Sequence, residues 1–479
     1  MNKLTKKIFL FAGITTLLTM TGSVSATNGY FAHAYSQKEA GLAGAGSAKV
    51  KDVDALTGAT NPANMVFAGD RWDLGIALFN PDRSYTSVGG PAIPASLDPF
   101  HPIGATSGCA QPTITPCQLP FSIGPQTIKS DNQLFPIPSF GWNKMLTDTS
   151  SIGVMIYGNG GMNTEYQGGS ARVYNPGTDT VVTAPGTYGA GTAGVDLMQL
   201  FVAPTYSVKV TENSSVGVSL IGAFQRFKAT GLSNFAGVTL NPTNLSNNGY
   251  ATSTGFGLKL GFNAQIIDGL RFAASYQSEI KMSSFDEYSG LFAEGGDFDI
   301  PETWTIGIAA DVGKKGTFVL DLQRINYDDI AAIANGLDPL FTQCLDALNS
   351  VLFGGSAVAS GPGCGGGING FGFGWDDMSI VKVGYEWDHS NDWTFRAGYS
   401  ITDQPIGSDD VVFNILAPAV IESHLTAGFT KQLSDGSEFT MSFMYGAGKK
   451  VKGTNPFDST QTLGIDMDQY QVGFTYSRK

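Results

Sequence analysis

The sequence has 479 residues and a formal net charge of −13, and only 14% of its residues are charged, against roughly 25% in average soluble domains. The acidic balance disfavours nucleic-acid binding, because phosphate contacts need basic patches. Aromatic residues make up 11% of the chain, yet after residue 26 no apolar run reaches the roughly 18 residues that a membrane-spanning helix needs. The composition therefore excludes a helical membrane protein and favours a transmembrane β-barrel, whose strands are apolar only at alternate positions.

Residues 1–26 have the three-part pattern of a secretory signal peptide. Lysines precede an apolar, uncharged stretch over residues 8–20, and the small residues Val24-Ser25-Ala26 form a cleavage site. The apolar stretch is too short for a good membrane anchor. We therefore expect an exported chain that is cleaved after Ala26.

Residues 27–69 show no strand-like alternation and are too apolar for a disordered linker. They contain the runs Asn28-Gly29-Tyr30-Phe31, Gly41-Leu42-Ala43-Gly44-Ala45-Gly46 and Asn61-Pro62-Ala63. A barrel of the size predicted below has a lumen that its own side chains cannot fill. We therefore expect this segment to be a plug, or hatch, inside the lumen.

From residue 70 to the end, apolar residues alternate with small or polar ones, as lipid-facing and lumen-facing positions of a barrel strand do. The run from Trp393 to Ile401 is one example. The connections between these segments are alternately short and long, which is typical of periplasmic turns and extracellular loops. The pattern predicts an all-β, antiparallel barrel of about fourteen strands, at residues 70–85, 134–145, 150–162, 196–210, 214–228, 252–267, 268–282, 301–312, 315–328, 376–388, 391–402, 419–432, 435–447 and 466–477.

The four cysteines, Cys109, Cys117, Cys344 and Cys364, all fall in the long connections. An exported protein meets an oxidising compartment, so two disulfides are expected. Pairing within each loop, Cys109 with Cys117 and Cys344 with Cys364, is the simplest of the three connectivities, and the others stay open. The cysteine spacings fit no zinc pattern, and we expect neither a metal nor a cofactor.

A possible amphipathic helix, Ile330 to Phe353, lies in the longest predicted loop before a glycine run. We expect it to pack on its own loop, and the alternative is a lid or an apolar landing surface. In the third predicted strand, Gly158, Gly160 and Gly161 would interrupt pairing with a neighbour. They indicate either an opening in the wall or an ordinary bulge.

The runs quoted from residues 28–63 resemble the N-terminal hatch of the FadL/TodX family of outer-membrane transporters for long-chain fatty acids and hydrophobic compounds. The stretch Gly158-Asn159-Gly160-Gly161 resembles the kinked strand of that family, although Asn-Gly-Gly stands where Pro-Phe-Gly is usual. Together with the strand count, the resemblance extends over essentially the whole chain.

The resemblance implies passive uptake of a hydrophobic small molecule, most often a long-chain fatty acid, with lateral exit into the membrane. Asn61, Pro62 and Ala63 would pin the hatch to the wall, or would merely turn the chain into the first strand. Tyr30 and Phe31 would line the pocket. The alternation places Glu386, Glu422 and His424 on the inward side with four cations that could bind a carboxylate or pair across the lumen: Arg271, Arg396, Lys259 and Lys382.

Other functions fit the residues less well. An outer-membrane lipase would need a Ser–His pair, but the chain has only His33, His101, His389 and His424, and Ser423 next to His424 points to the other face. We therefore expect no enzyme. A hydrocarbon transporter, a general porin and a structural barrel remain alternatives. The expected partners are the small hydrophobic substrate and outer-membrane lipid, and we expect a monomer.

Overall fold

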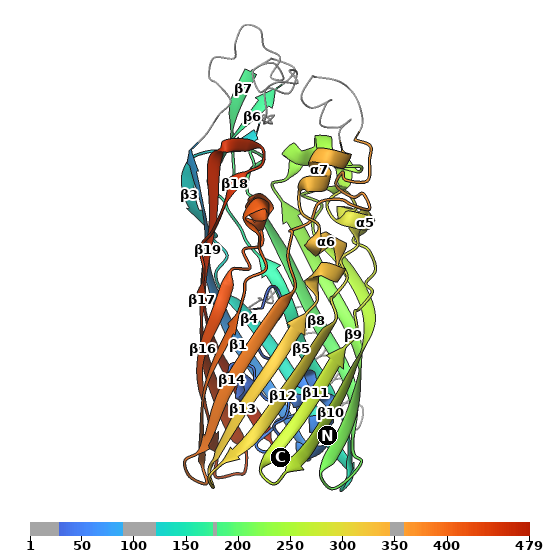
Figure 1. The fold of residues 1–479 in the computed structure, drawn as a ribbon, viewed down its shortest axis with the longest axis vertical. Coiled ribbons are helices and arrows are strands. Elements are labelled where there is room, and N and C mark those ends of the chain that lie inside the picture. The colour runs from blue at the N-terminus through green and yellow to red at the C-terminus, as the bar shows by residue number, and fades with distance from the viewer. Residues whose placement is uncertain (1–27, 90–120, 176–179, 345–358) are drawn as a thin grey trace, which may run out of the picture.

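A computed structural model describes residues 28–89, 121–175, 180–344 and 359–479. Fourteen antiparallel strands pair in sequence order, and the last pairs with the first to close a barrel (Figure 1). No helix in the described ranges is long and apolar enough to span a membrane. The strands are β1 (Arg71–Gly89), β4 (Phe135–Thr147), β5 (Ser150–Asn163), β8 (Gly194–Lys209), β9 (Ser214–Thr230), β10 (Ala251–Ile267), β11 (Leu270–Gln277), β12 (Thr303–Val312), β13 (Gly316–Ile325), β14 (Met378–Asp388), β15 (Trp393–Thr402), β16 (Ile421–Gln432), β17 (Glu438–Gly448) and β19 (Asp458–Arg478).

The predicted fold class is confirmed, since each of the fourteen predicted segments overlaps one barrel strand. Some observed strand ends differ from the predicted ones where the chain leaves the barrel wall. β11 stops at Gln277 instead of residue 282, whereas β19 starts at Asp458 instead of residue 466. The earlier start of β19 has a physical reason, because its added residues pair with a short strand, β18 (Val451–Asn455).

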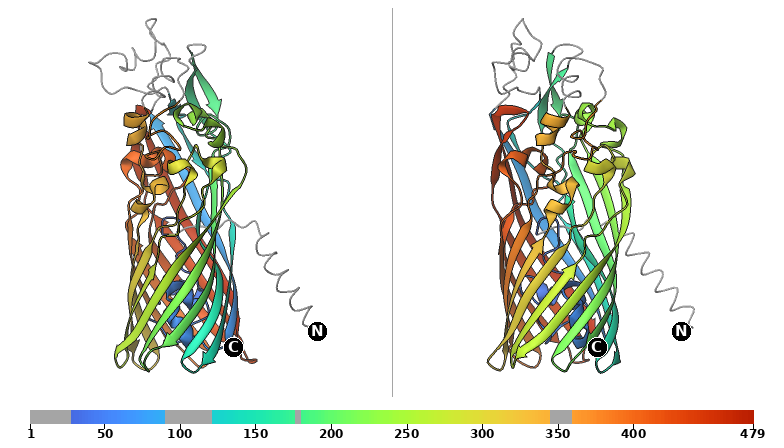
Figure 2. Two further views of the ribbon diagram at one scale, coloured as in Figure 1. Left: turned by 90° about the vertical axis from the view of Figure 1, so that its right-hand side faces the viewer. Right: turned by 45° about the vertical axis from the view of Figure 1, so that its right-hand side comes forward.

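The short connections between consecutive strands of the barrel wall lie at one end of the barrel, called the turn end below, and the C-terminus lies there too (Figure 1). The long connections gather at the opposite loop end (Figure 2). The loop end carries a small sheet of β2 (Phe121–Ile123), β6 (Ser170–Asn175) and β7 (Thr180–Pro185), the strand β3 (Gln126–Lys129), and short helices: η2 (Ser233–Val238), η3 (Pro242–Asn244), η4 (Asp286–Tyr288), α5 (Ala293–Gly296), η5 (Tyr327–Asp329), α6 (Ala331–Ala334), α7 (Asp338–Gln343), η6 (Ser408–Asp410) and α9 (Val411–Asn414).

The predicted single helix from Ile330 to Phe353 is wrong in its described part. Two short helices, α6 and α7, stand there, because the backbone becomes extended at Asn335 and a new helix begins at Asp338, with Pro339 in its first turn. Residues 345–353 lie outside the described ranges. Cys344 and Cys364 form a disulfide, and Cys109 and Cys117 lie outside the described residues.

Side chains on the outer face of the wall form an apolar belt, as the alternation predicts for strands in contact with lipid. On β1 the outward row is apolar from Trp72 to Leu78 and becomes polar at Asn80. The inward row is mostly buried near the turn end, because the chain before β1 fills the lumen there, and the exceptions lie on β10–β13, where Gln265, Arg271, Asp311 and Thr317 line a cavity. Exposed members of the belt include Leu74, Ile76, Leu220, Phe256, Leu260, Ile306, Leu322, Val381, Tyr399, Leu425 and Phe443.

Candidate functional site

Residues 28–70, called the plug below, occupy the turn-end half of the lumen (Figures 1 and 2). Three short helices shape it: α2 (Gln37–Ala40), α3 (Thr57–Thr60) and η1 (Pro62–Phe67). Ser36 caps α2 by accepting from the Lys38 amide, and Asn61 caps η1 by accepting from the Ala63 amide. Pro62 is the first residue of η1. An N–H at this position would have no partner within the helix, so proline, which lacks one, fits there. Caps and Pro therefore fix the local path in a segment with little regular structure.

The run Asn61–Ala63 touches the barrel wall. The Asn61 amide donates to the Phe262 carbonyl at 3.1 Å and to the plug carbonyl of Ser47 at 2.9 Å. Two wall glycines make this approach possible, since a Cβ on Gly261 would lie 2.1 Å from the Asn61 Oδ1 atom, and one on Gly217 would lie 2.3 Å from the Pro62 carbonyl carbon. The geometry is that of an anchor between plug and wall.

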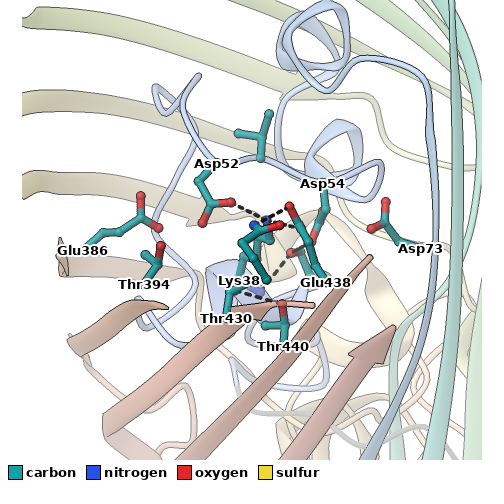
Figure 3. Close-up of polar contacts among 12 residues, drawn as sticks. Lys38, Asp52, Asp54, Asp73, Glu386, Thr394, Thr430, Glu438 and Thr440 are labelled. Atoms are coloured by element: carbon teal, nitrogen blue, oxygen red, sulfur yellow. Dashed lines mark hydrogen bonds and ion pairs between the residues drawn. The ribbon is translucent and has the colours of Figure 1, made fainter. Parts of the chain in front are cut away.

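A network of buried charges joins the other side of the plug to the wall (Figure 3). The Lys38 ammonium contacts Asp52 at 2.5 Å within the plug and Glu438 of β17 at 2.9 Å. Arg396 of β15 bonds to Glu386 at 2.7 Å, to Thr430 at 2.8 Å and to Asp52. Each charge is thus paired with one from a distant part of the chain, which offsets the cost of burying it.

Glu39 lies within the plug and forms no ion pair with any of the described residues. The hydroxyl groups of Thr60 and Thr57 donate to its carboxyl group at 2.6 and 3.3 Å. Burial, reinforced by the nearby charge of Asp54, raises the pKa of Glu39 from an ordinary value of about 4.5 to about 8. The docked plug therefore favours the protonated form of this side chain.

Three other cations predicted on the inward side also bond to the protein itself. Lys382 donates to the His33 carbonyl at 3.1 Å, and Lys259 donates to the Ala59 carbonyl. Arg271 lies at the turn end, where it donates to Asn263 at 2.8 Å and stacks over Phe67. The predicted inward position of Glu422 is wrong, because a register shift between Ile421 and Ser423 displaces it and it pairs with exposed Lys449.

The plug also covers a buried chain of polar side chains on β15, β16 and β19. The His424 Nδ1 atom lies 3.0 Å from the Ser400 hydroxyl, and its Nε2 atom lies 3.1 Å from Gln469. The ring of His33 stacks on His424 with centroids 4.0 Å apart. This pair involves Ser400 of the neighbouring strand and not Ser423, and both side chains are enclosed between plug and wall, each with 1% of its surface exposed. Within the described ranges, no cluster of three metal-ligating side chains is found.

The wall is interrupted between β4 and β5. The two strands pair from the turn end as far as Phe140 of β4 and Ile156 of β5. Beyond that point, among the described residues, Phe135–Ser139 of β4 pair only with β1. Pro136 and Pro138 have no backbone N–H to donate across the gap. On the other side of the gap, β5 carries one extra residue, Asn159, where its register against β8 shifts.

Plug residues 30–32 occupy the free edge of β5 like a short added strand. The Ala32 amide donates to the Asn159 carbonyl at 2.7 Å, and the Gly161 amide donates to the Tyr30 carbonyl at 2.8 Å. A Cβ on Gly160 would lie 1.9 Å from the Tyr30 carbonyl oxygen, so glycine is required for this approach. We call these contacts the seam. The predicted wall glycines, Gly158, Gly160 and Gly161, all lie at the bulge or at the seam.

Cavities lie on both sides of the seam. The upper cavity, of about 40 Å³, lies on the loop-end side and is lined by Gly29, Phe79, Arg83, Gly161, Met162, Asn163, Trp375, Ala417, Pro418, Ala419, Ile421 and Met467. The gap cavity, of about 20 Å³, lies where β4 and β5 separate and is lined by residues that include Ala32, Ala77, Ile137, Tyr157 and Gly158. Spaces of this size hold a few water molecules, so a larger ligand must displace the lining.

None of the four predicted ligand-binding residues lines the upper cavity directly. Tyr30 and Phe31 are fully buried and do not line it; their rings pack against Tyr327 and, for Tyr30, against Trp375, which does line it. Neither Arg271 nor Arg396 is among the lining residues. Arg83, which the sequence did not single out, is the cation that lines the cavity. A further apolar pocket, of about 30 Å³, lies among the loops and is lined by residues such as Phe227, Phe235, Phe292, Phe371 and Phe413.

A closed fourteen-stranded barrel with an apolar outer belt and a plugged lumen is the architecture of an outer-membrane channel. Residues 17–477 match the family described as outer membrane protein transport protein (OMPP1/FadL/TodX). The chain belongs to this family of bacterial outer-membrane transporters of hydrophobic compounds, and its turn end therefore faces the periplasm. No curated protein was found to match the sequence.

Solved structures share the fold at low sequence identity. The toluene transporter TodX of Pseudomonas putida is 16% identical, with a TM-score of 0.57, and the match covers 95% of this chain and 99% of TodX. A FadL homologue of Pseudomonas aeruginosa is 12% identical, with a TM-score of 0.60 and coverages of 94% and 99%. The toluene transporter TbuX of Ralstonia pickettii is 14% identical, with a TM-score of 0.54 and coverages of 93% and 98%.

Proposed function

We propose that this protein takes up hydrophobic small molecules, long-chain fatty acids first among them, by passive diffusion through the plugged barrel, and releases them sideways through the seam. The observation that carries the proposal is the seam itself. Plug backbone, and not β4, bonds to the edge of β5 above Ile156, so a movement of the plug would free this edge and widen the gap between β4 and β5. The upper cavity and the gap cavity adjoin the seam from its two sides.

The route is favourable for an apolar molecule and unfavourable for a polar one. Each CH₂ group that leaves water gains about 0.8 kcal/mol, so a ligand that passes from an apolar cavity into lipid loses little of this gain. The plug is held to the wall at Asn61–Ala63 and by the charge network, and its residues 30–32 are held by two backbone hydrogen bonds across the seam. We infer that this end of the plug moves first, and that one barrel, which encloses its own route, works as a monomer.

A variant with a closed wall tests the lateral route. Deleting Asn159 removes the bulged residue and leaves the pairing of residues 160–163 with β8 as it is. Pro136→Val and Pro138→Val restore two backbone donors to β4. We expect the combined variant to lose most uptake of labelled oleate by cells that lack their own transporter.

Pro204→Val is the matched control, because Pro204 is an outward-facing proline of β8 that lies away from the gap. It should leave uptake unchanged. Correct insertion of each variant is checked by the heat-dependent gel mobility of the barrel. Full oleate uptake by an inserted, closed-wall variant would contradict lateral release and favour passage to the periplasm.

Neutral hydrocarbons are the alternative substrates. The lining of the upper cavity is mainly apolar, and two of the structural neighbours are described as toluene transporters. Parallel uptake assays with labelled oleate and labelled toluene separate the two classes. Uptake of toluene alone would move the proposal to hydrocarbons, whereas uptake of neither by an inserted barrel would overturn it for both.

A further inference from the structure

We propose that the outer face of the wall beside the gap binds the headgroup of a phosphorylated glycolipid, the class of lipid that forms the outer leaflet of bacterial outer membranes. The binding site is a polar cavity, called the outer cavity below, at the loop-end margin of the apolar belt. The ligand is a lipid of the surrounding membrane and not the transported molecule, so the inference is independent of the proposed substrate.

The outer cavity has a volume of about 570 Å³, within the range of roughly 300–1,000 Å³ that small-molecule sites occupy. Both sides of the gap contribute to it, because Phe135 of β4 and Thr164, which follows β5, line it. This cavity differs from the upper cavity and from the pocket among the loops, whose linings are mainly apolar. Its own lining is mostly polar and includes Asn163, Glu165, Asp196, Lys228, Asn247 and Tyr250.

The cavity lies on the outer face of the wall, on the loop-end side of the belt. On β9 the residues that alternate with Arg226 and Lys228 are buried against the lumen, so these two cations belong to the outward row. Toward the turn end the same row carries Leu220 and Phe224, and Phe256 of the neighbouring β10 is 85% exposed. Acyl chains that cover these apolar side chains would bring their headgroup to the two cations, and cations at a membrane surface attract anionic lipid.

The two cations at this margin have capacity left for an anion. The Arg226 guanidinium and the Lys228 ammonium lie 4.2 and 5.0 Å from the centre of the Tyr250 ring. Arg226 contacts Asp196 at 3.7 Å, but its buried Nε atom has no hydrogen-bond partner among the described residues. Lys228 forms no ion pair within the described ranges. Phosphate oxygens accept hydrogen bonds from both kinds of cation, and a bound anion offsets the repulsion between the two.

The other polar groups of the cavity favour a sugar over a bare anion. Glu165 and Asp196 are carboxylates, which repel phosphate but accept hydrogen bonds from hydroxyl groups. Asp196 already accepts from the Tyr250 hydroxyl at 2.6 Å, and Asn247 adds an exposed amide. A ligand that joins phosphate to hydroxyl-bearing sugar rings satisfies the cations and the carboxylates together. Its acyl chains then lie on the belt, which makes the ligand a phosphorylated glycolipid.

Lipid binding by the purified protein tests the assignment. The probes are lipid A, an acylated sugar lipid with two phosphates, and phosphatidylglycerol, which has a phosphate and no sugar. Both are titrated, and bound lipid is detected by native mass spectrometry. We expect the unmodified protein to bind lipid A more tightly than phosphatidylglycerol. The double variant Arg226→Gln, Lys228→Gln should raise the apparent Kd for lipid A about 10- to 30-fold, the effect of two cations at a lipid surface.

Thr192→Trp is a second variant, in which no charge changes. Thr192 is exposed and lines the cavity, so a larger side chain there would occupy the space of the headgroup without removing a cation. We expect this variant to weaken lipid A binding at least about tenfold. Correct folding of each variant is checked by the heat-dependent gel mobility of the barrel.

The matched control is Lys281→Gln with Arg324→Gln, which removes two other loop-end cations that pair with carboxylates and do not line the cavity. It should bind lipid A as the unmodified protein does. Unchanged lipid A binding in either cavity variant, or an equal loss in the control, would overturn the site. Phosphatidylglycerol bound as tightly as lipid A would overturn the assignment to a glycolipid.

Discussion

At the scale of single residues, the charges of the lumen illustrate what a sequence can and cannot predict. Alternation along β14 and β15 correctly placed Lys382, Glu386 and Arg396 on the inward side. It could not show that Arg396 contacts Asp52, a plug residue 344 positions away in the chain. Arg83 was missed for the same reason, because a side chain is recognised as part of a cavity wall only after the contacts of its neighbours are known.

Glu39 gives the plug a dependence on pH. Its folded pKa is raised above the unfolded value, so its stabilising contribution is complete below about pH 4.5 and is lost as the pH rises through about 8. The contribution falls by about 2 kcal/mol between pH 6 and pH 8, at 1.36 kcal/mol per pH unit. We expect amide hydrogen exchange in the plug to rise over this range, and to rise less in Glu39→Gln. Glu422→Gln, outside the plug, is the control and should behave as the unmodified protein. If the pH dependence of exchange in Glu39→Gln equals that of the unmodified protein, this role of Glu39 is contradicted.

At the scale of elements, the sequence predicted the barrel strands better than it predicted the structure of the loops. Each wall strand has a lipid face and a lumen face, and this requirement leaves a two-residue period in its sequence. The loops carry no such constraint, and the predicted helix from Ile330 was broken by Asn335 and Pro339. The glycines of β5 indicated from the sequence that the wall is interrupted there. The part played by the prolines of β4, and the pairing of the plug with the edge of β5, became clear only from the observed strand pairing.

Gly160→Val should separate the plug from β5. Its Cβ would meet the Tyr30 carbonyl, so residues 30–32 must leave the edge, and amide exchange at Ala32 and Gly161 should rise at least about tenfold, the effect of 1.4 kcal/mol. Gly222→Val on β9 is the matched control, because a Cβ there lies 3.7 Å from its nearest neighbour. If exchange at Ala32 is equally slow in both variants, plug backbone does not seal the wall as described.

At the scale of the whole molecule, the fold separates two tasks. The apolar outer belt and thirteen paired strand junctions hold the barrel in lipid. The remaining junction, between β4 and β5, is paired only near the turn end, and beyond it the plug pairs with the edge of β5. The plug is anchored by buried hydrogen bonds and ion pairs near the turn end, whereas its residues 30–32 are joined to β5 by two backbone hydrogen bonds. The sequence predicted the plug and the barrel as parts, and their joint function depends on contacts between residues far apart in the chain.

The most direct test of the account is to map where a fatty acid lies as it leaves the barrel. A photoreactive long-chain fatty acid is supplied to cells that carry the protein, and its adducts are located by mass spectrometry after illumination. Lateral release predicts adducts at Ala77 and Ile137 in the gap cavity, and predicts that deleting Asn159 together with Pro136→Val and Pro138→Val abolishes them. Adducts at Val50 and Gln265, which line a cavity of about 180 Å³ at the turn end, with none at Ala77 or Ile137, would contradict release through the seam and indicate passage to the periplasm.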